Sequence, residues 1–119
     1  MTAHGEFFWY ELMTRDVEGI KKFYADTLGW TYQEMDMGPG GIYTIISAGD
    51  EQVGGIVNMV GDDFEGMAEH WMGYIKVDDI DARVDAAKTG GATIRSGPFS
   101  IPNVGRMAIL EQPDGAVVA

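Results

Sequence analysis

Few side chains in this sequence can carry acid–base or metal chemistry, and Glu11 is the strongest of them. The chain has no cysteine and only two histidines, His4 and His70, which excludes thiolate nucleophiles, cysteine-ligated zinc and iron–sulfur clusters. A carboxylate within an apolar segment, such as Glu11, is costly to bury without a partner. We therefore expect it to meet a cation, Lys76 or Arg106, or a cationic group of a ligand. A desolvated glutamate could also act as a general base, so Glu11 is the catalytic candidate.

The two histidines give little support for metal chemistry. His70 begins a predicted strand and is the remaining candidate for a metal ligand, although a solvated histidine at a strand end is the commoner arrangement. His4 lies in a terminal segment that we expect to fray, and we expect no role for it.

Glu11 shares one face of its predicted strand with aromatic and thioether side chains. Residues 7–13 alternate in character, as do residues 70–77, so every second side chain points to the same side. That side suits a pocket for a flat or partly apolar molecule, and the alternative is that the same rings fill a core. The candidate ligand-binding residues are Phe7, Trp9, Glu11, Met59, Met72, Tyr74, Arg106 and Met107.

The two alternating segments open two copies of one pattern of elements. Asp16 can cap a helix that ends at Gly29, and Asp79, sixty-three residues after Asp16, begins a helix that ends at Gly90. Further strands are predicted at residues 30–36, 42–48 and 52–59, then near 93 and at 106–111 and 116–119, with loops at 38–41 and 97–102. The pattern predicts βαβββ units at residues 6–60 and 70–119 of a single α+β domain, 1–119, whose curved mixed sheet surrounds a cleft.

The charge balance limits the classes of partner. The formal net charge is −11, with 19 acidic against 8 basic residues, which disfavours nucleic acid because phosphate binding needs a lysine- and arginine-rich surface. No apolar run approaches the roughly 18 residues of a membrane span, and no leader pattern opens the chain, so we expect a soluble, cytoplasmic protein without a membrane partner. The acidic excess serves solubility or attracts a cationic ligand.

Several short motifs carry a resemblance to a known family. They are Asp16-Val17, Phe23-Tyr24 with Gly29-Trp30, Val77-Asp78-Asp79-Ile80 with Gly90-Gly91-Ala92, and Gln112-Pro113-Asp114-Gly115. With these motifs the chain resembles the glyoxalase/bleomycin-resistance/extradiol-dioxygenase superfamily, also called the vicinal oxygen chelate proteins. The resemblance covers nearly the whole chain and implies the fold of that family.

The resemblance also implies where a metal would bind in metal-using relatives. The ligand positions carried over by motif spacing are Trp9, Met72, Ala119 and a position within residues 54–57. None of them offers a side-chain oxygen or imidazole nitrogen for a hard divalent cation. We therefore expect a member of the family without the metal site and without a cofactor, the alternative being a divalent metal held by other residues.

Three functions follow from these observations. The first is a metal-independent protein that binds a small, cationic or aromatic molecule in the cleft between the two units. The second is a metal-dependent lyase or dioxygenase with non-standard ligands, and the third is an interaction module whose cleft is vestigial. By resemblance to the family we also expect a two-fold homodimer.

Overall fold

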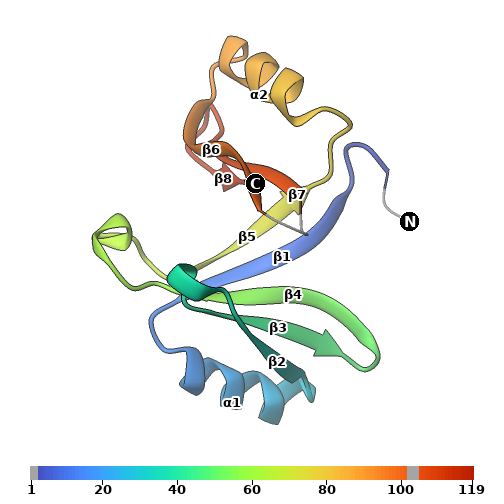
Figure 1. Ribbon diagram of the computed structural model, residues 1–119, viewed down its shortest axis with the longest axis vertical. Helices are drawn as coiled ribbons and strands as arrows, with labels where there is room; N and C mark the ends of the chain where they lie inside the picture. Colours follow the sequence, from blue (N-terminus) through green and yellow to red (C-terminus); the bar gives the residue numbers. More distant parts are fainter. Residues whose placement is uncertain (1–2, 102–104) are drawn as a thin grey trace. The chain divides into compact units, whose positions relative to one another are not determined.

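The computed structural model describes residues 3–101 and 105–119, and this part of the chain holds two α-helices and eight strands (Figure 1). The elements are β1 Phe7–Thr14, α1 Val17–Leu28, β2 Thr31–Asp36, β3 Ile42–Ala48, β4 Glu51–Asn58, β5 His70–Ile75, α2 Ile80–Thr89, β6 Thr93–Ile101, β7 Gly105–Glu111 and β8 Val117–Val118. Single 3₁₀ turns occupy Gly38–Gly40 and Asp62–Phe64. The α+β class and the mixed sheet are confirmed. No helix within the described residues is long and apolar enough to cross a membrane.

The chain divides into two compact units. One is Trp9–Trp71, called here the 9–71 unit; the other joins Met72–Ala119 to the residues before Trp9 and is called the 72–119 unit. The strands β1 and β5 therefore each contribute residues to both units.

In the 9–71 unit, the strands lie in the order β2-β3-β4-β1. The pairing of β1 with β4 is parallel and the other two pairings are antiparallel. Helix α1 covers one face of this sheet, and Val17 and Ile20 from the helix pack against the buried cluster of Leu12, Ile46 and Ile56.

Helix α1 begins and ends where the sequence predicted. The Asp16 side chain accepts a hydrogen bond from the Gly19 amide at 3.0 Å, which satisfies one of the free donors of the first turn. Gly29 takes a left-handed conformation with φ of 73° and ends the helix.

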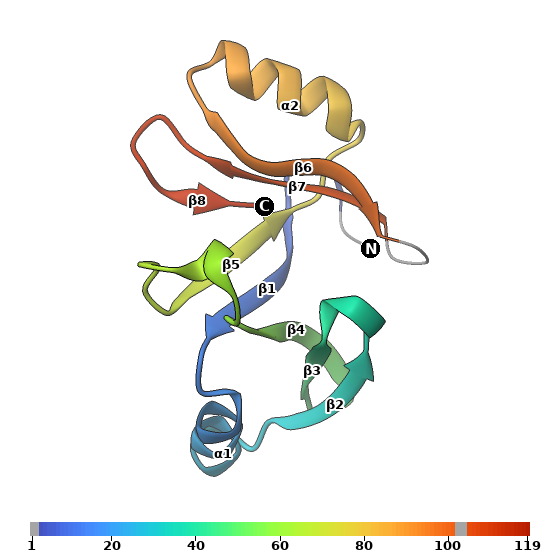
Figure 2. The same ribbon diagram turned by 60° about the vertical axis from the view of Figure 1, so that its left-hand side comes forward.

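In the 72–119 unit, β6, β7 and β8 form an antiparallel sheet, and α2 lies over β6 and β7 (Figure 2). The backbone of Ala119 accepts from Ile75 at 2.8 Å and donates to Gly73 at 3.0 Å, so the segment after β8 lies beside β5. Lys76 exchanges backbone hydrogen bonds with the N-terminal segment, accepting from Gly5 and donating to Glu6.

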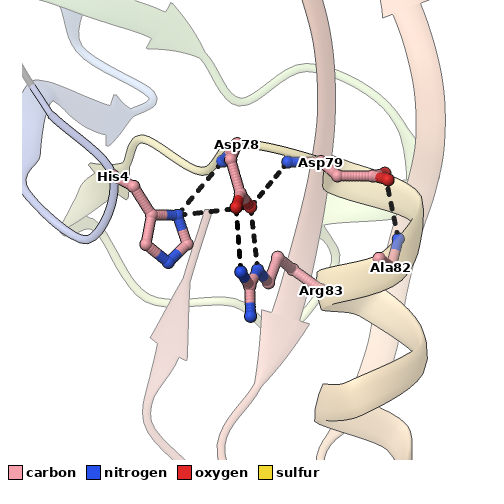
Figure 3. A network of polar contacts seen from close by, with 5 residues as sticks. All are labelled: His4, Asp78, Asp79, Ala82 and Arg83. Carbon is pink, nitrogen blue, oxygen red and sulfur yellow. Dashed lines mark hydrogen bonds and ion pairs between the residues drawn. The ribbon is translucent and has the colours of Figure 1, made fainter.

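The segment around His4, which the sequence predicted to fray, forms hydrogen bonds with residues of the 72–119 unit. His4 Nδ1 accepts from the Asp78 amide at 3.1 Å, and both carboxylate oxygens of Asp78 accept from the Arg83 guanidinium at 2.9 Å (Figure 3). The hydrogen bonds from Arg83 hold the pKa of Asp78 well below its ordinary range. His4 thus contacts the residue that precedes the N-cap of α2, a structural contact that the sequence did not predict.

The predicted loop at residues 97–102 is also wrong for its described part. Strand β6 continues through Ile101 and pairs with β7 as far as Gly105, with irregular register at Ser96. Gly97 has a φ of 83°, which lets the backbone bulge while the strand continues. Pro102 lies outside the described residues.

Candidate functional site

Three side chains of the 9–71 unit are linked by hydrogen bonds along one face of its sheet. The Trp9 indole Nε1 donates to the Tyr43 hydroxyl at 3.0 Å, and that hydroxyl donates to Glu11 Oε2 at 2.8 Å. Trp9 and Glu11 come from β1, whereas Tyr43 comes from β3. Glu11 is 8% exposed, so its carboxylate lies in a largely desolvated place.

The direction of these hydrogen bonds is fixed by the donors. An indole N–H can only donate, so the Tyr43 oxygen accepts from Trp9 and its own proton points to Glu11. Burial, and then the charge of Glu11, raise the pKa of Tyr43 far above its ordinary value. The phenol therefore stays protonated and serves Glu11 as a permanent donor.

Gly55 makes this arrangement possible. On β4 it pairs with Glu11 of β1 on one side and with Ile45 of β3 on the other. A Cβ atom built on Gly55 would collide with the hydroxyl and ring of Tyr43. The Tyr43 side chain therefore occupies the space above Gly55 to reach Glu11.

Tyr43 and Gly55 were not among the site residues predicted from the sequence. One partner of Glu11 is the Tyr43 phenol, which the sequence did not predict. The pairing of Glu11 with Lys76 or Arg106 stays a prediction. A signal did exist in the two glycines at 54 and 55, since glycine inside a strand marks a bulge or a close approach.

The other predicted residues of the 9–71 unit have structural partners. Met59 is 4% exposed, and its amide donates to the Thr14 carbonyl at 2.9 Å. His70 lies at the start of β5, where its Nδ1 is 2.8 Å from the carbonyl oxygen of Ala68.

In the 72–119 unit, the predicted residues fall into two groups. Phe7 lies against Gly73, and the Tyr74 hydroxyl is 4.0 Å from the Met107 sulfur, while Met72 is 2% exposed. Arg106 instead forms an ion pair with Asp81 of α2, with nitrogen–oxygen distances of 2.9 and 3.1 Å. The hydrogen bonds from Arg106 lower the pKa of Asp81.

The ligand positions implied by the family do not fit a hard metal ion. The Trp9 nitrogen carries a proton and donates it to Tyr43, Met72 offers a buried thioether, and Ala119 has no donor side chain. Across residues 3–101 and 105–119, no group of three or more His, Asp or Glu side chains is placed to hold a metal ion. We therefore derive no chemical step through a metal.

The chain matches known proteins over nearly its whole length. The sequence profile of the Glyoxalase/Bleomycin resistance protein/Dioxygenase superfamily matches residues 6–119. CFP32 of Mycobacterium tuberculosis, named as a candidate glyoxylase, is 39% identical over 111 residues, which are 92% of this chain and 42% of CFP32. The anthracycline biosynthesis protein DnrV of Streptomyces peucetius is 31% identical over 123 residues, covering 93% of this chain and 44% of DnrV. The chain thus spans less than half the length of these two relatives.

A solved structure shares the fold. The hypothetical protein BH1468 from Bacillus halodurans superposes with a TM-score of 0.73 over 98% of this chain and 92% of its own, at 14% sequence identity. At that identity the likeness is one of fold alone.

Proposed function

Because the chain belongs to the Glyoxalase/Bleomycin resistance protein/Dioxygenase superfamily, we propose that it binds a small aromatic or cationic molecule without a metal, against the Trp9–Tyr43–Glu11 face of its 9–71 unit. The observation that supports this function is the hydrogen bond from Tyr43 to Glu11. It gives the largely desolvated Glu11 carboxylate a donor within a cluster that also holds the Trp9 indole. A ligand with a positive group on an aromatic body would match both features.

The donor set of the site further supports a role in binding. Tyr43 is held protonated by burial and by the Glu11 charge, and the Trp9 indole does not titrate, so both groups remain donors across neutral pH. A carboxylate whose neighbours do not change their protonation favours binding and selection of a cation over proton transfer.

The name of DnrV suggests a probe for this function. An anthracycline combines a flat aromatic body with an amino sugar, so it carries both features expected of the ligand. We propose to test such a compound beside simpler probes, benzylammonium and benzyl alcohol, which differ in charge.

The decisive measurement is calorimetric titration of the wild type and of Glu11→Gln with benzylammonium and an anthracycline. We expect the variant to bind about tenfold more weakly, which corresponds to about 1.4 kcal/mol. Glu51→Gln, an exposed position on β4, makes the same charge change and serves as the matched control. Equal affinity of Glu11→Gln and wild type, or equal binding of benzyl alcohol, would contradict the proposed site.

Metal analysis tests the alternative of a metalloenzyme. Protein purified without chelator would be analysed for nickel, zinc, manganese and iron. We expect no stoichiometric metal. Stoichiometric metal that is lost in Glu11→Ala or His70→Ala would overturn the proposal in favour of a metal-dependent lyase or dioxygenase.

A further inference from the structure

A hollow of about 370 Å³ opens in the 9–71 unit, away from the Glu11 cluster. Its lining residues are Tyr10, Trp30, Ile46, Val53 and Trp71. Tyr10 alternates with Trp9 and Glu11 along β1 and so points to the opposite face of the sheet. That face carries α1 and the buried cluster around Ile46.

Two of the lining rings, Trp30 and Trp71, contact each other, and both contact Tyr24. Tyr24 stacks on Trp30 with ring centroids 4.6 Å apart and planes inclined by 28°. The Trp71 ring meets both of them edge to face, at centroid distances of 6.0 and 6.2 Å. Such mutual contacts fix the orientation of the rings, so the walls are formed before any ligand arrives.

Two walls of the hollow leave much apolar surface in contact with water. Trp71 is 43% exposed and Tyr10 is 48% exposed, and both line the hollow together with the buried Ile46. A ligand that covered these rings would remove apolar surface from water, which is favourable in proportion to the area covered.

The chemistry of the lining selects the ligand. None of the five lining residues carries a charge, so a charged group would lose its hydration without gaining a counter-ion. The volume is at the small end of the range for ligand pockets, and aromatic walls favour flat rings that stack or meet them edge to face. We propose that the hollow lined by Tyr10, Trp30, Ile46, Val53 and Trp71 binds a small, uncharged aromatic ring system.

This site is independent of the proposed function at Glu11. Its ligand class is uncharged, its residues lie on the other face of the sheet, and no lining residue belongs to the Trp9–Tyr43–Glu11 cluster. Glu11→Gln is therefore expected to leave binding in the hollow unchanged, which separates a failure of one proposal from a failure of the other.

The test is an NMR titration of ¹⁵N-labelled protein with 1-naphthol, observed at the indole N–H signals of the three tryptophans. We expect the signals of Trp30 and Trp71 to shift saturably at concentrations up to about 1 mM, while that of Trp9 stays in place. Naphthalene-2-sulfonate, with the same rings and a negative charge, should bind at least tenfold more weakly.

Matched variants locate the ligand. Val53→Phe places a ring in the hollow and should weaken naphthol binding at least tenfold, whereas Val60→Phe, at a position 71% exposed, should not. If Val53→Phe fails to fold, Trp71→Leu removes one wall at a half-exposed position and should weaken binding likewise. The proposal is overturned by the absence of saturable shifts, by equal binding of the sulfonate, by unchanged affinity of the folded wall variant, or by shifts centred on Trp9 that Glu11→Gln abolishes.

Discussion

A carboxylate buried on an apolar strand is costly unless a donor meets it, and Tyr43 supplies that donor to Glu11. Replacement Tyr43→Phe removes one hydroxyl and with it the hydrogen bond that the buried Glu11 carboxylate accepts. We expect the free energy of unfolding, measured by urea denaturation, to fall by about 1–3 kcal/mol.

Tyr32→Phe is the matched control for this measurement. The Tyr32 hydroxyl donates to the neutral Lys21 carbonyl at 2.9 Å, so its loss should cost less than the loss of a hydrogen bond to a charged acceptor. Equal losses in the two variants would show that the Glu11 carboxylate gains no more from its phenol partner than a neutral carbonyl does.

The raised pKa of Tyr43 gives a dependence of stability on alkaline pH. Because the folded protein holds this proton more tightly than the unfolded chain, the contribution is fully present below the ordinary tyrosine pKa of about 10. It is lost as pH rises towards the higher pKa of the folded state. Unfolding free energy should therefore fall less steeply above pH 10 in Tyr43→Phe than in the wild type, and an unchanged slope would contradict the assignment.

Gly55 offers a test of the space that Tyr43 requires. Gly55→Ala should destabilise the protein by about 1–3 kcal/mol, because the new methyl group would collide with the Tyr43 side chain. The same change in a Tyr43→Ala background should cost much less, since the colliding ring is gone. Gly90→Ala, where a Cβ would meet backbone oxygens at ordinary distances of 3.4 and 3.5 Å, is the control.

At the residue scale, the sequence was sufficient to place Trp9 and Glu11 on one face of a strand but not to find their partner. Alternation assigns a face within a single strand, whereas the contact with Tyr43 depends on the order and register of β1, β4 and β3. Register between distant strands is set by packing and by loop geometry, which no short window of sequence contains.

At the element scale, helix ends were predictable because their signals are local. Asp16, Gly29 and Asp79 all act as the sequence predicted. The continuation of β6 was not predictable in this way. Gly97 and Pro98 usually interrupt a strand, but pairing with β7 extends β6 across them.

Replacing Gly19 with alanine should change the stability in opposite directions with and without the Asp16 cap of α1. A Cβ on Gly19 would collide with the Asp16 carboxylate that accepts from its amide. Gly19→Ala should therefore destabilise the wild type although alanine is the better helix former, and should stabilise an Asp16→Ala variant by about 0.5–1 kcal/mol. Asp16→Ala alone should cost about 1 kcal/mol. Chemical denaturation of the four proteins in this cycle measures the coupling, and strictly additive effects would rule it out.

The ion pair of Asp78 with Arg83, between β5 and α2, should make the stability of the protein depend on pH in acid. Arg83 lowers the pKa of Asp78 in the folded state, so this pair stabilises the fold above the ordinary aspartate pKa of about 3.9 and loses its effect as pH falls towards the lower folded value. Arg83→Gln should flatten the dependence of melting temperature on pH below pH 4. Arg95→Gln, at another exposed arginine, is the control, and identical acid profiles of the wild type and Arg83→Gln would exclude the effect.

At the scale of the whole molecule, a net charge of −11 on 119 residues implies repulsion among acidic side chains. Salt shortens the Debye length from about 30 Å at 0.01 M to about 8 Å at 0.15 M, so the melting temperature should rise by a few degrees over this range. Asp62→Asn with Asp63→Asn should raise it at low salt and reduce the response to salt. A melting temperature that falls with salt would mean that attractive ion pairs outweigh the repulsion.

The parallel pairing of β1 with β4 has a consequence for how the chain folds as it is made. Tyr10 pairs with Gly54, forty-four residues later, so the 9–71 sheet cannot close on the ribosome until β4 has emerged. Gly5 and Glu6 can pair only after their backbone partner Lys76 has been synthesised. The backbone of β5 in turn pairs with Ala119, which is synthesised later still. Gly5, Glu6 and Tyr10 are thus synthesised well before their native partners, and such distant pairings slow folding.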